Sequence, residues 1–150
     1  MVYFGIAVRV AKGAPYLRGV ILDADPTIPT KVFEYTSSSD ADLAVQIQAL
    51  ADGLSSQLRL QAQGAKRVVL RQGDGGGRAG ATAAAVVTFR AEGAALYVAR
   101  KVCVDVRVLN GPNVGRACGG DKLEAERQAR EIVDEAFVIA ASAALAARGL

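Results

Sequence analysis

A nearly uninterrupted apolar run, Val2–Val10, constrains the fold more than any other segment of this sequence. Its only charged residue is Arg9. A strand with apolar residues at both even and odd positions needs cover on both faces, so the run predicts a buried central strand in a sheet flanked by helices. A chain of 150 residues can bury a core of this kind, and we expect residues 1–150 to form a single domain.

The remaining pattern predicts two further strands, followed by helices and strands in alternation. We expect strands at Val2–Val10, Gly19–Asp23, Lys31–Thr36, Lys66–Arg71 and Val102–Leu109. We expect helices from the Ser37–Asp40 cap region to Gly64, over Ala81–Lys101, and from Asp121 to Ala147. Ala11–Arg18 is predicted to be a turn and residues 110–120 a loop. The order βββαβαβα predicts an α/β domain with a mixed five-stranded sheet.

Three patches, in chain order, resemble the ribonuclease H-like superfamily and, within it, the RuvC-type Holliday-junction resolvases. They read FGIAVRV, KRVVLRQGDGGGRAGATAAAVV and GGDKLEAERQAREIVDEAFVIAASAALA. In element order the resemblance covers nearly the whole chain. It implies phosphodiester hydrolysis by two Mg²⁺ or Mn²⁺ ions on carboxylate ligands. The family takes these carboxylates from an Asp in the first strand, a Glu ending the fourth strand and acids on the last helix.

The sequence departs from the family pattern at the metal-binding positions. By register, Ala7 occupies the position of the strand Asp, and Gln72 lies near the position of the Glu. Only Glu135, with Asp134 beside it, matches the last-helix acid. One carboxylate cannot neutralise two divalent cations, and Arg9 nearby would repel them. We therefore predict a ribonuclease H-like domain that needs no cofactor and has no nuclease activity.

Two other functions stay open at this stage. A rearranged carboxylate site of Asp74, Glu135 and Asp134 would make the protein a Mg²⁺- or Mn²⁺-dependent structure-specific endonuclease. A pseudo-enzyme that serves as an assembly subunit would bind no nucleic acid. The apolar segment Ala136–Leu145 and the Leu43–Leu58 stripe are candidate surfaces for a homodimer or higher oligomer, provided that the chain itself does not cover them.

Basic residues concentrate in the middle of the chain. Residues 65–130 contain twelve Lys or Arg against six Asp or Glu, whereas residues 1–64 have a net charge of −1. A basic region of this kind predicts a polyanionic partner, which we take to be nucleic acid, DNA in preference to RNA; scattered surface charge is the alternative. The expected phosphate contacts are Arg9, Arg71, Arg78, Arg116, Lys122, Arg127 and Arg130.

The residue inventory excludes several other chemistries. The chain has no His and two Cys, which excludes Ser-His catalysis, His metal sites and four-cysteine zinc sites. Gly75–Gly80 matches a dinucleotide fingerprint, but Asp105 is misplaced as its acid, so a flexible glycine-rich turn is favoured. The intermediate alternative is an anion site for a backbone phosphate, formed by glycine amides at a helix N-terminus together with Arg78. Cys118 lies beside Arg116, which would lower its pKa, although a bystander thiol is favoured.

Neither a membrane span nor base-stacking aromatics are expected. No stretch reaches the roughly 20 apolar residues of a span and the first residues lack the features of a leader, so we expect a cytoplasmic protein. The aromatic side chains do not interleave with a basic stretch, and we expect most of them in the core. They are Tyr3, Phe4, Tyr16, Phe33, Tyr35, Phe89, Tyr97 and Phe137.

Overall fold

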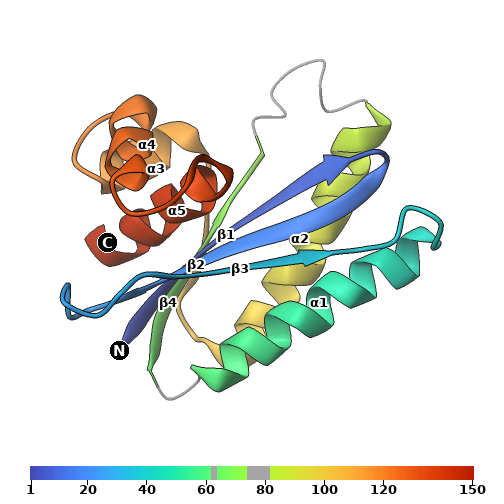
Figure 1. The fold of residues 1–150 in the computed structure, drawn as a ribbon, viewed down its shortest axis with the longest axis horizontal. Coiled ribbons are helices and arrows are strands. Elements are labelled where there is room, and N and C mark those ends of the chain that lie inside the picture. The colour runs from blue at the N-terminus through green and yellow to red at the C-terminus, as the bar shows by residue number, and fades with distance from the viewer. Residues whose placement is uncertain (62–63, 74–81) are drawn as a thin grey trace.

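Five strands form one mixed sheet with the opening apolar run at its centre. The computed structural model describes all residues except 62–63 and 74–81. The strand order is β3-β2-β1-β4-β5, in which β1 runs antiparallel to β2 and parallel to β4 (Figure 1). The strands are β1 (Val2–Ala11), β2 (Ala14–Asp23), β3 (Lys31–Thr36), β4 (Ala65–Arg71) and β5 (Val106–Leu109). The predicted fold class and the central strand are confirmed.

Helices cover both faces of the sheet. α1 (Leu43–Leu60) and α2 (Ala83–Val102) lie on one side, and α3 (Gly111–Ala117), α4 (Lys122–Arg130) and α5 (Val138–Gly149) lie on the other (Figure 1). Even-numbered β1 residues such as Phe4 and Ile6 pack in the core with α1 and α2, whereas Tyr3 and Ala7 pack in the core with α5. The two cores explain why the strand is apolar on both of its faces.

Helix α5 rests directly on β1 at Gly5. A Cβ built on Gly5 would lie 2.0 Å from Ala140 O and 2.2 Å from Ala144 N, so only glycine allows this approach. All residues from Val138 to Ala147 except Ile139 are buried, by the sheet on one side and by α3 and α4 on the other. The chain therefore covers the helix that we considered as an oligomer surface, and the Leu50–Leu58 part of the α1 stripe is core as well.

The first hairpin is tighter than predicted. The turn is only Lys12-Gly13, with φ of 51° and 77°, and most of the segment predicted to be a turn belongs to β1 and β2. Two left-handed residues match the twist of the flanking strands. Pro15 was the reason for predicting a turn here. The pairing of β2 with β3 begins only at Tyr16, so the missing N–H of Pro15 removes no hydrogen bond between these two strands.

The C-terminal third also differs from prediction. Residues 110–120 are not all loop, because the Asn110 side chain accepts a hydrogen bond from Asn113 N and starts α3. The predicted last helix is two helices, separated by residues 131–134 and a 3₁₀ turn, Glu135–Phe137, because α5 lies on the sheet and α4 packs against α5. Asp121 caps α4 as expected, its side chain accepting from Glu124 N.

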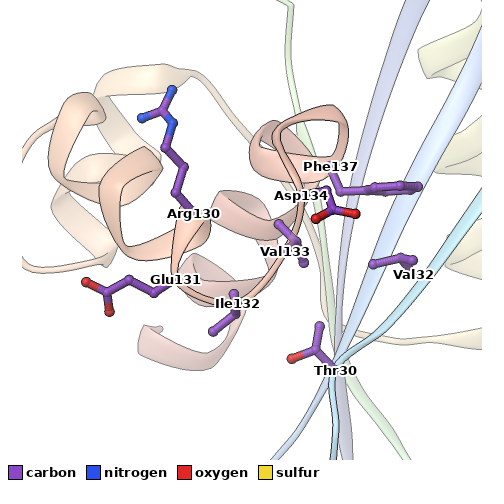
Figure 2. A pocket seen from close by; sticks show the side chains of 8 residues that line it. All are labelled: Thr30, Val32, Arg130, Glu131, Ile132, Val133, Asp134 and Phe137. Carbon is purple, nitrogen blue, oxygen red and sulfur yellow. The ribbon is translucent and has the colours of Figure 1, made fainter.

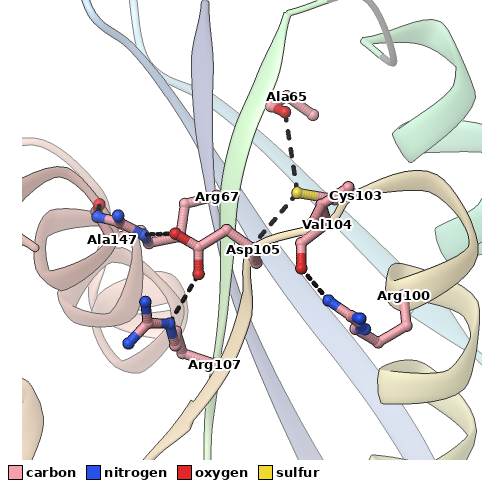
Figure 3. Close-up of polar contacts among 8 residues, drawn as sticks. All are labelled: Ala65, Arg67, Arg100, Cys103, Val104, Asp105, Arg107 and Ala147. Atoms are coloured by element: carbon pink, nitrogen blue, oxygen red, sulfur yellow. Dashed lines mark hydrogen bonds and ion pairs between the residues drawn. The ribbon is translucent and has the colours of Figure 1, made fainter.

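The connection from α2 to β5 is held by polar contacts. The expected strand starting at Val102 begins only at Val106, and Cys103 is buried at the end of α2 rather than in the sheet. Asp105 accepts from both Arg67 and Arg107, and Arg67 also donates to Ala147 O, which ties β4 to α5 (Figure 3). The hydrogen bond from Arg107 holds the pKa of Asp105 below its usual value. Asp105 thus has a structural role, not that of a ribose-binding acid.

In the described part of the chain, we find no helix long and apolar enough to cross a bilayer.

Candidate nucleic-acid interface

A row of charged side chains crosses the sheet on the face covered by α5. Strand register places Glu34 opposite Arg18, Arg18 opposite Ala7, and Ala7 opposite Arg71. Side chains in register on neighbouring strands project from the same face. Ala7, the position at which the family resemblance would place an Asp, therefore lies between two arginines. The strand residue level with Ala7 is Arg71, and Gln72 follows it after the end of β4.

The side chains around Ala7 do not fit a pair of divalent cations. Ala7 is buried and offers only a methyl group, and residues 138–147 of α5 contain no acid. Hard cations need several oxygen ligands, mainly carboxylates. Among the residues that the structure describes, no three His, Cys, Asp or Glu side chains gather as a metal site. The buried Arg71 on the neighbouring strand β4 would further repel a cation.

Arg18 has a structural role in this row. It forms an ion pair with Glu34 and donates to Ala136 O at 2.9 Å. Its guanidinium lies 4.8 Å from the ring centroid of Tyr16 and 5.7 Å from that of Phe137. Arg18 therefore joins β2 and β3 to the turn that precedes α5, and Glu34 balances its charge.

A buried carboxylate, Glu92, meets the end of β4. Glu92 on α2 accepts a hydrogen bond from Gly73 N at 3.0 Å and is only 5% exposed. Burial raises its pKa, and this outweighs the hydrogen bond from Gly73 and the attraction of Arg9 and Arg71, which lower it. We did not single out Glu92 from the sequence, where the available signal was a lone acid in an Ala-rich helix.

Arg9, Arg71 and Lys122 form the positive part of this site. Arg9 Nη1 lies 3.9 Å from the position that a Cβ on Gly73 would occupy, close to the Glu92 carboxylate. Arg71 Nη2 and Lys122 Cδ lie 2.7 and 2.8 Å from the corresponding point on Gly111, so the two side chains converge over the start of α3. We call Arg9, Arg71, Lys122 and Glu92 the cationic site.

Arg71 contributes to the cationic site through its electrostatic field and not through direct contact with a ligand. It is 2% exposed, and its Nη1 donates to Gln72 O. A side chain this deeply buried cannot touch a phosphate in the conformation observed. Its positive charge in a poorly solvated position still raises the local potential for an anion.

The other expected phosphate contacts lie elsewhere. Arg116 is exposed on α3 and donates to Asn113 Oδ1 at 3.1 Å. Arg127 pairs with Glu124 and Glu131 on the exposed side of α4, so its charge is locally balanced. Its hydrogen bonds lower the pKa of Glu124 to about 2. Arg78 and the glycine-rich turn lie outside the described residues.

Glu135 and Asp134, the described acids of the alternative rearranged metal site, face different neighbours. Glu135 forms an ion pair with Arg130 at 2.9 Å, and this hydrogen bond lowers its pKa. Arg130 also lies 3.8 Å from Glu126. Asp134 lines an open groove of about 420 Å³ whose opposite wall includes Val32 of β3, two strands away from β1 (Figure 2). Asp74 lies outside the described residues.

The surroundings of Cys118 do not activate its thiol. Burial raises the pKa of its thiol above 9.0. Cys118 Sγ lies 3.8 Å from Ser142 O of α5, whereas Arg116 turns toward Asn113. Cys118 therefore packs between α3 and α5 as a bystander thiol, the alternative favoured from the sequence.

Two aromatic side chains expected in the core are on the surface. Phe89 is 38% exposed and Tyr97 is 63% exposed, both on α2. Lys101 Nζ lies 4.6 Å from the Tyr97 ring centroid, so basic and aromatic groups do adjoin there. The eight-residue spacing of Phe89 and Tyr97, with Gly93 between them, was the available sequence signal.

Comparison with solved structures shows which known proteins share this fold. No family model matches the chain, and no curated protein matches its sequence. Among solved structures, the chain is similar to RuvC of Thermus thermophilus, with 16% identity and a TM-score of 0.68 over 97% of this chain and 92% of that one. It is also similar to T. thermophilus RuvC in complex with a Holliday junction substrate, with 16% identity, a TM-score of 0.73 and the same coverage. The chain thus has the RuvC-like ribonuclease H fold.

Proposed function

We propose that this protein binds nucleic acid, DNA in preference to RNA, at the cationic site and does not cleave it. The observation that carries the proposal is Ala7 between Arg18 and Arg71, at the strand position where the resemblance places a metal-binding Asp. A site that repels divalent cations attracts phosphates. The shared fold supports the proposal, because T. thermophilus RuvC is known in complex with a Holliday junction substrate.

The accessible charges set the expected salt dependence. Among the described residues, Arg9, Lys122 and Arg116 are the predicted contacts with exposed or half-buried side chains that lie outside the Arg127 and Arg130 ion pairs of α4. Each phosphate contact contributes about −0.9 to the slope of log K against log salt for duplex DNA. Three contacts therefore predict a slope of about −3.

The direct test is a titration of labelled four-way junction, duplex and single strand at low and moderate salt, with Mn²⁺ in half of the samples. We expect salt-sensitive binding and intact nucleic acid in every sample. Cleavage with Mn²⁺ would overturn the proposal and favour an endonuclease site that includes Asp74. Failure to bind any form would overturn it in favour of the assembly subunit.

Charge-removing variants locate the binding. Arg9→Gln and Lys122→Gln should each weaken binding and make the salt slope shallower by about 1. Arg59→Gln is the matched control, since it removes one exposed charge in the last turn of α1. Equal effects of all three variants would indicate nonspecific attraction by net charge and would refute the assignment of the site.

A further inference from the structure

Strand β3 forms one edge of the sheet. It pairs with β2 over Tyr16–Ile21, and no other strand in the described part of the chain pairs with it. Alternate N–H and C=O groups of Lys31–Thr36 therefore point away from the sheet. β3 has six residues, whereas β5 at the other edge has four. Free backbone groups along an edge strand are a template for one more strand, so β3 is able to accept a sixth strand on its outer side.

An open groove of about 420 Å³ lies beside β3 on the sheet face that α5 covers. Thr30 and Val32 line one side of it, and residues 130–134 with Phe137 line the other (Figure 2). A smaller cavity of about 160 Å³ shares Thr30 and Ile132 with the groove and continues along the loop before β3. The two together form an elongated hollow along the start of β3, and this shape fits an extended peptide.

The groove exists because the turn before α5 lies over β2 and not over β3. Arg18 of β2 donates to Ala136 O of this turn at 2.9 Å. Val32 of β3 projects from the same sheet face as Arg18 by strand register, and it stays 48% exposed. Ile132 is 39% exposed on the opposite side of the groove. A strand added to β3 would therefore find apolar surface next to its backbone partner.

Both sides of the groove are acidic, although the whole chain has a net charge of +3. Residues 23–42, which contain β3 and its flanking loops, include five acids and one Lys, a net charge of −4. Residues 124–137, on the other side, include five acids and two Arg, a net charge of −3. Both arginines are paired with glutamates, and no hydrogen bond or ion pair to the Asp134 carboxylate is found among the described residues. The groove is therefore complementary in charge to a basic segment.

We propose that the groove and the outer edge of β3 bind an extended basic segment of a partner protein, which joins the sheet as a sixth strand. The backbone of the segment bonds to the free groups of β3, and alternate side chains face the groove. A Lys in register with Val32 has its Cβ about 4.5–5.5 Å from that of Val32. Its alkyl stem packs on Val32, and its ammonium group extends toward Asp134.

Charge disfavours the two other occupants of such an edge. A second copy paired through β3 would bring two acidic edges together, and a nucleic acid would place its phosphates against the same carboxylates. The cationic site lies elsewhere, because β1 with Ala7 is two strands away from β3. The basic partner segment is therefore additional to the nucleic acid of the proposed function.

Nuclear magnetic resonance of the isotope-labelled full chain tests the proposal with a capped seven-residue peptide of alternating Thr and Lys. We expect chemical-shift changes concentrated in β3 and residues 130–137, and a dissociation constant that rises with salt. A control peptide with Glu in place of each Lys should leave the spectrum unchanged. No change at millimolar Lys peptide, changes centred on another surface, or equal effects of the Glu peptide would each overturn the proposal. Signals of β3 that shift with protein concentration alone would reveal a second copy at this edge and overturn it as well.

Backbone N-methylation of the peptide tests whether it binds as a strand. In an extended chain, the N–H groups of alternate residues point to the same edge. Methylation of the Thr residues therefore blocks one edge of the peptide, and methylation of the Lys residues blocks the other. One methylated peptide should keep its affinity and the other should lose it. Equal affinities of the two methylated peptides would refute the addition of a sixth strand.

Two variants of the protein locate the binding. Asp134→Asn should weaken binding of the Lys peptide about two- to fivefold, the range of an exposed ion pair, and Val32→Lys should weaken it further by placing a positive charge in the groove. Asp52→Asn, exposed on α1, and Val108→Lys, at a residue 45% exposed on the other edge strand, are the matched controls. Circular dichroism checks that each variant is folded. Control effects as large as those of the two variants would refute the assignment of the groove. Binding of duplex DNA, measured without peptide, reports on the proposed function separately.

Discussion

Substituting Gly5 by alanine tests the contact that seats α5 over the sheet. The added Cβ would lie 2.0 Å from Ala140 O and 2.2 Å from Ala144 N. These are backbone atoms of a helix, so they cannot turn aside as a flexible side chain can. Overpacking a core usually costs about 1–3 kcal/mol where side chains adjust. Because a whole helix must shift here, we expect a loss of at least ~3 kcal/mol, a large part of the 5–15 kcal/mol typical of a domain.

Urea unfolding of Gly5→Ala and Gly93→Ala provides an internal control. The same change at Gly93 meets open space and should raise the free energy of unfolding by about 0.5–1 kcal/mol. The melting temperature of Gly5→Ala should fall by roughly 6–12 °C, at 2–4 °C per kcal/mol for a chain of this length. A Gly5→Ala protein within about 1 kcal/mol of the wild type would refute the close packing of α5 on β1.

Three further predictions concern titration and metal binding. The pKa of Glu92 is raised, so its contribution to stability declines as pH rises from about 4.5 through the raised pKa. The unfolding free energy of Glu92→Gln minus that of the wild type should therefore increase between pH 4.5 and 7, and a flat difference would contradict burial of the charge. Because burial raises the pKa of Cys118, alkylation by iodoacetamide at pH 8 should be slower than that of a free thiol, and fast labelling would refute this packing. Mg²⁺ and Mn²⁺ should leave the melting temperature unchanged in calorimetry, whereas a concentration-dependent rise would reveal a metal site.

The strands and the first two helices were predictable because their signals are local. The nearly unbroken apolar run of β1 indicates a strand buried on both faces. Leu50, Leu54 and Leu58 recur at the spacing of one helix face and indicate α1. The errors came where local signals conflict with packing. Pro15 and Gly13 suggested a long turn, but strand pairing continues to Ala11 and Ala14. The glycines around α3 concealed a short helix with a good cap at Asn110.

The candidate site was predictable only in part. The sequence shows that Ala7 is not an acid, but strand register alone shows that Arg18 and Arg71 flank it. Glu92 joins the site because α2 crosses the end of β4, a contact with no local signature. Arg127 and Arg130 looked like phosphate contacts, and side-chain geometry pairs both with glutamates.

The sequence by itself determined the α/β class, the order of the five strands and the first two helices, and the lack of a strand carboxylate in β1. These properties depend on residue type and on the spacing of apolar residues along the chain, because helices and strands have different backbone repeats. The tertiary structure alone decided which charges meet, which aromatic rings stay in water and that α5 is buried. Those properties depend on contacts between residues such as Gly5 and Ala140, far apart in the chain, whose distance follows only from the packed arrangement of all the elements.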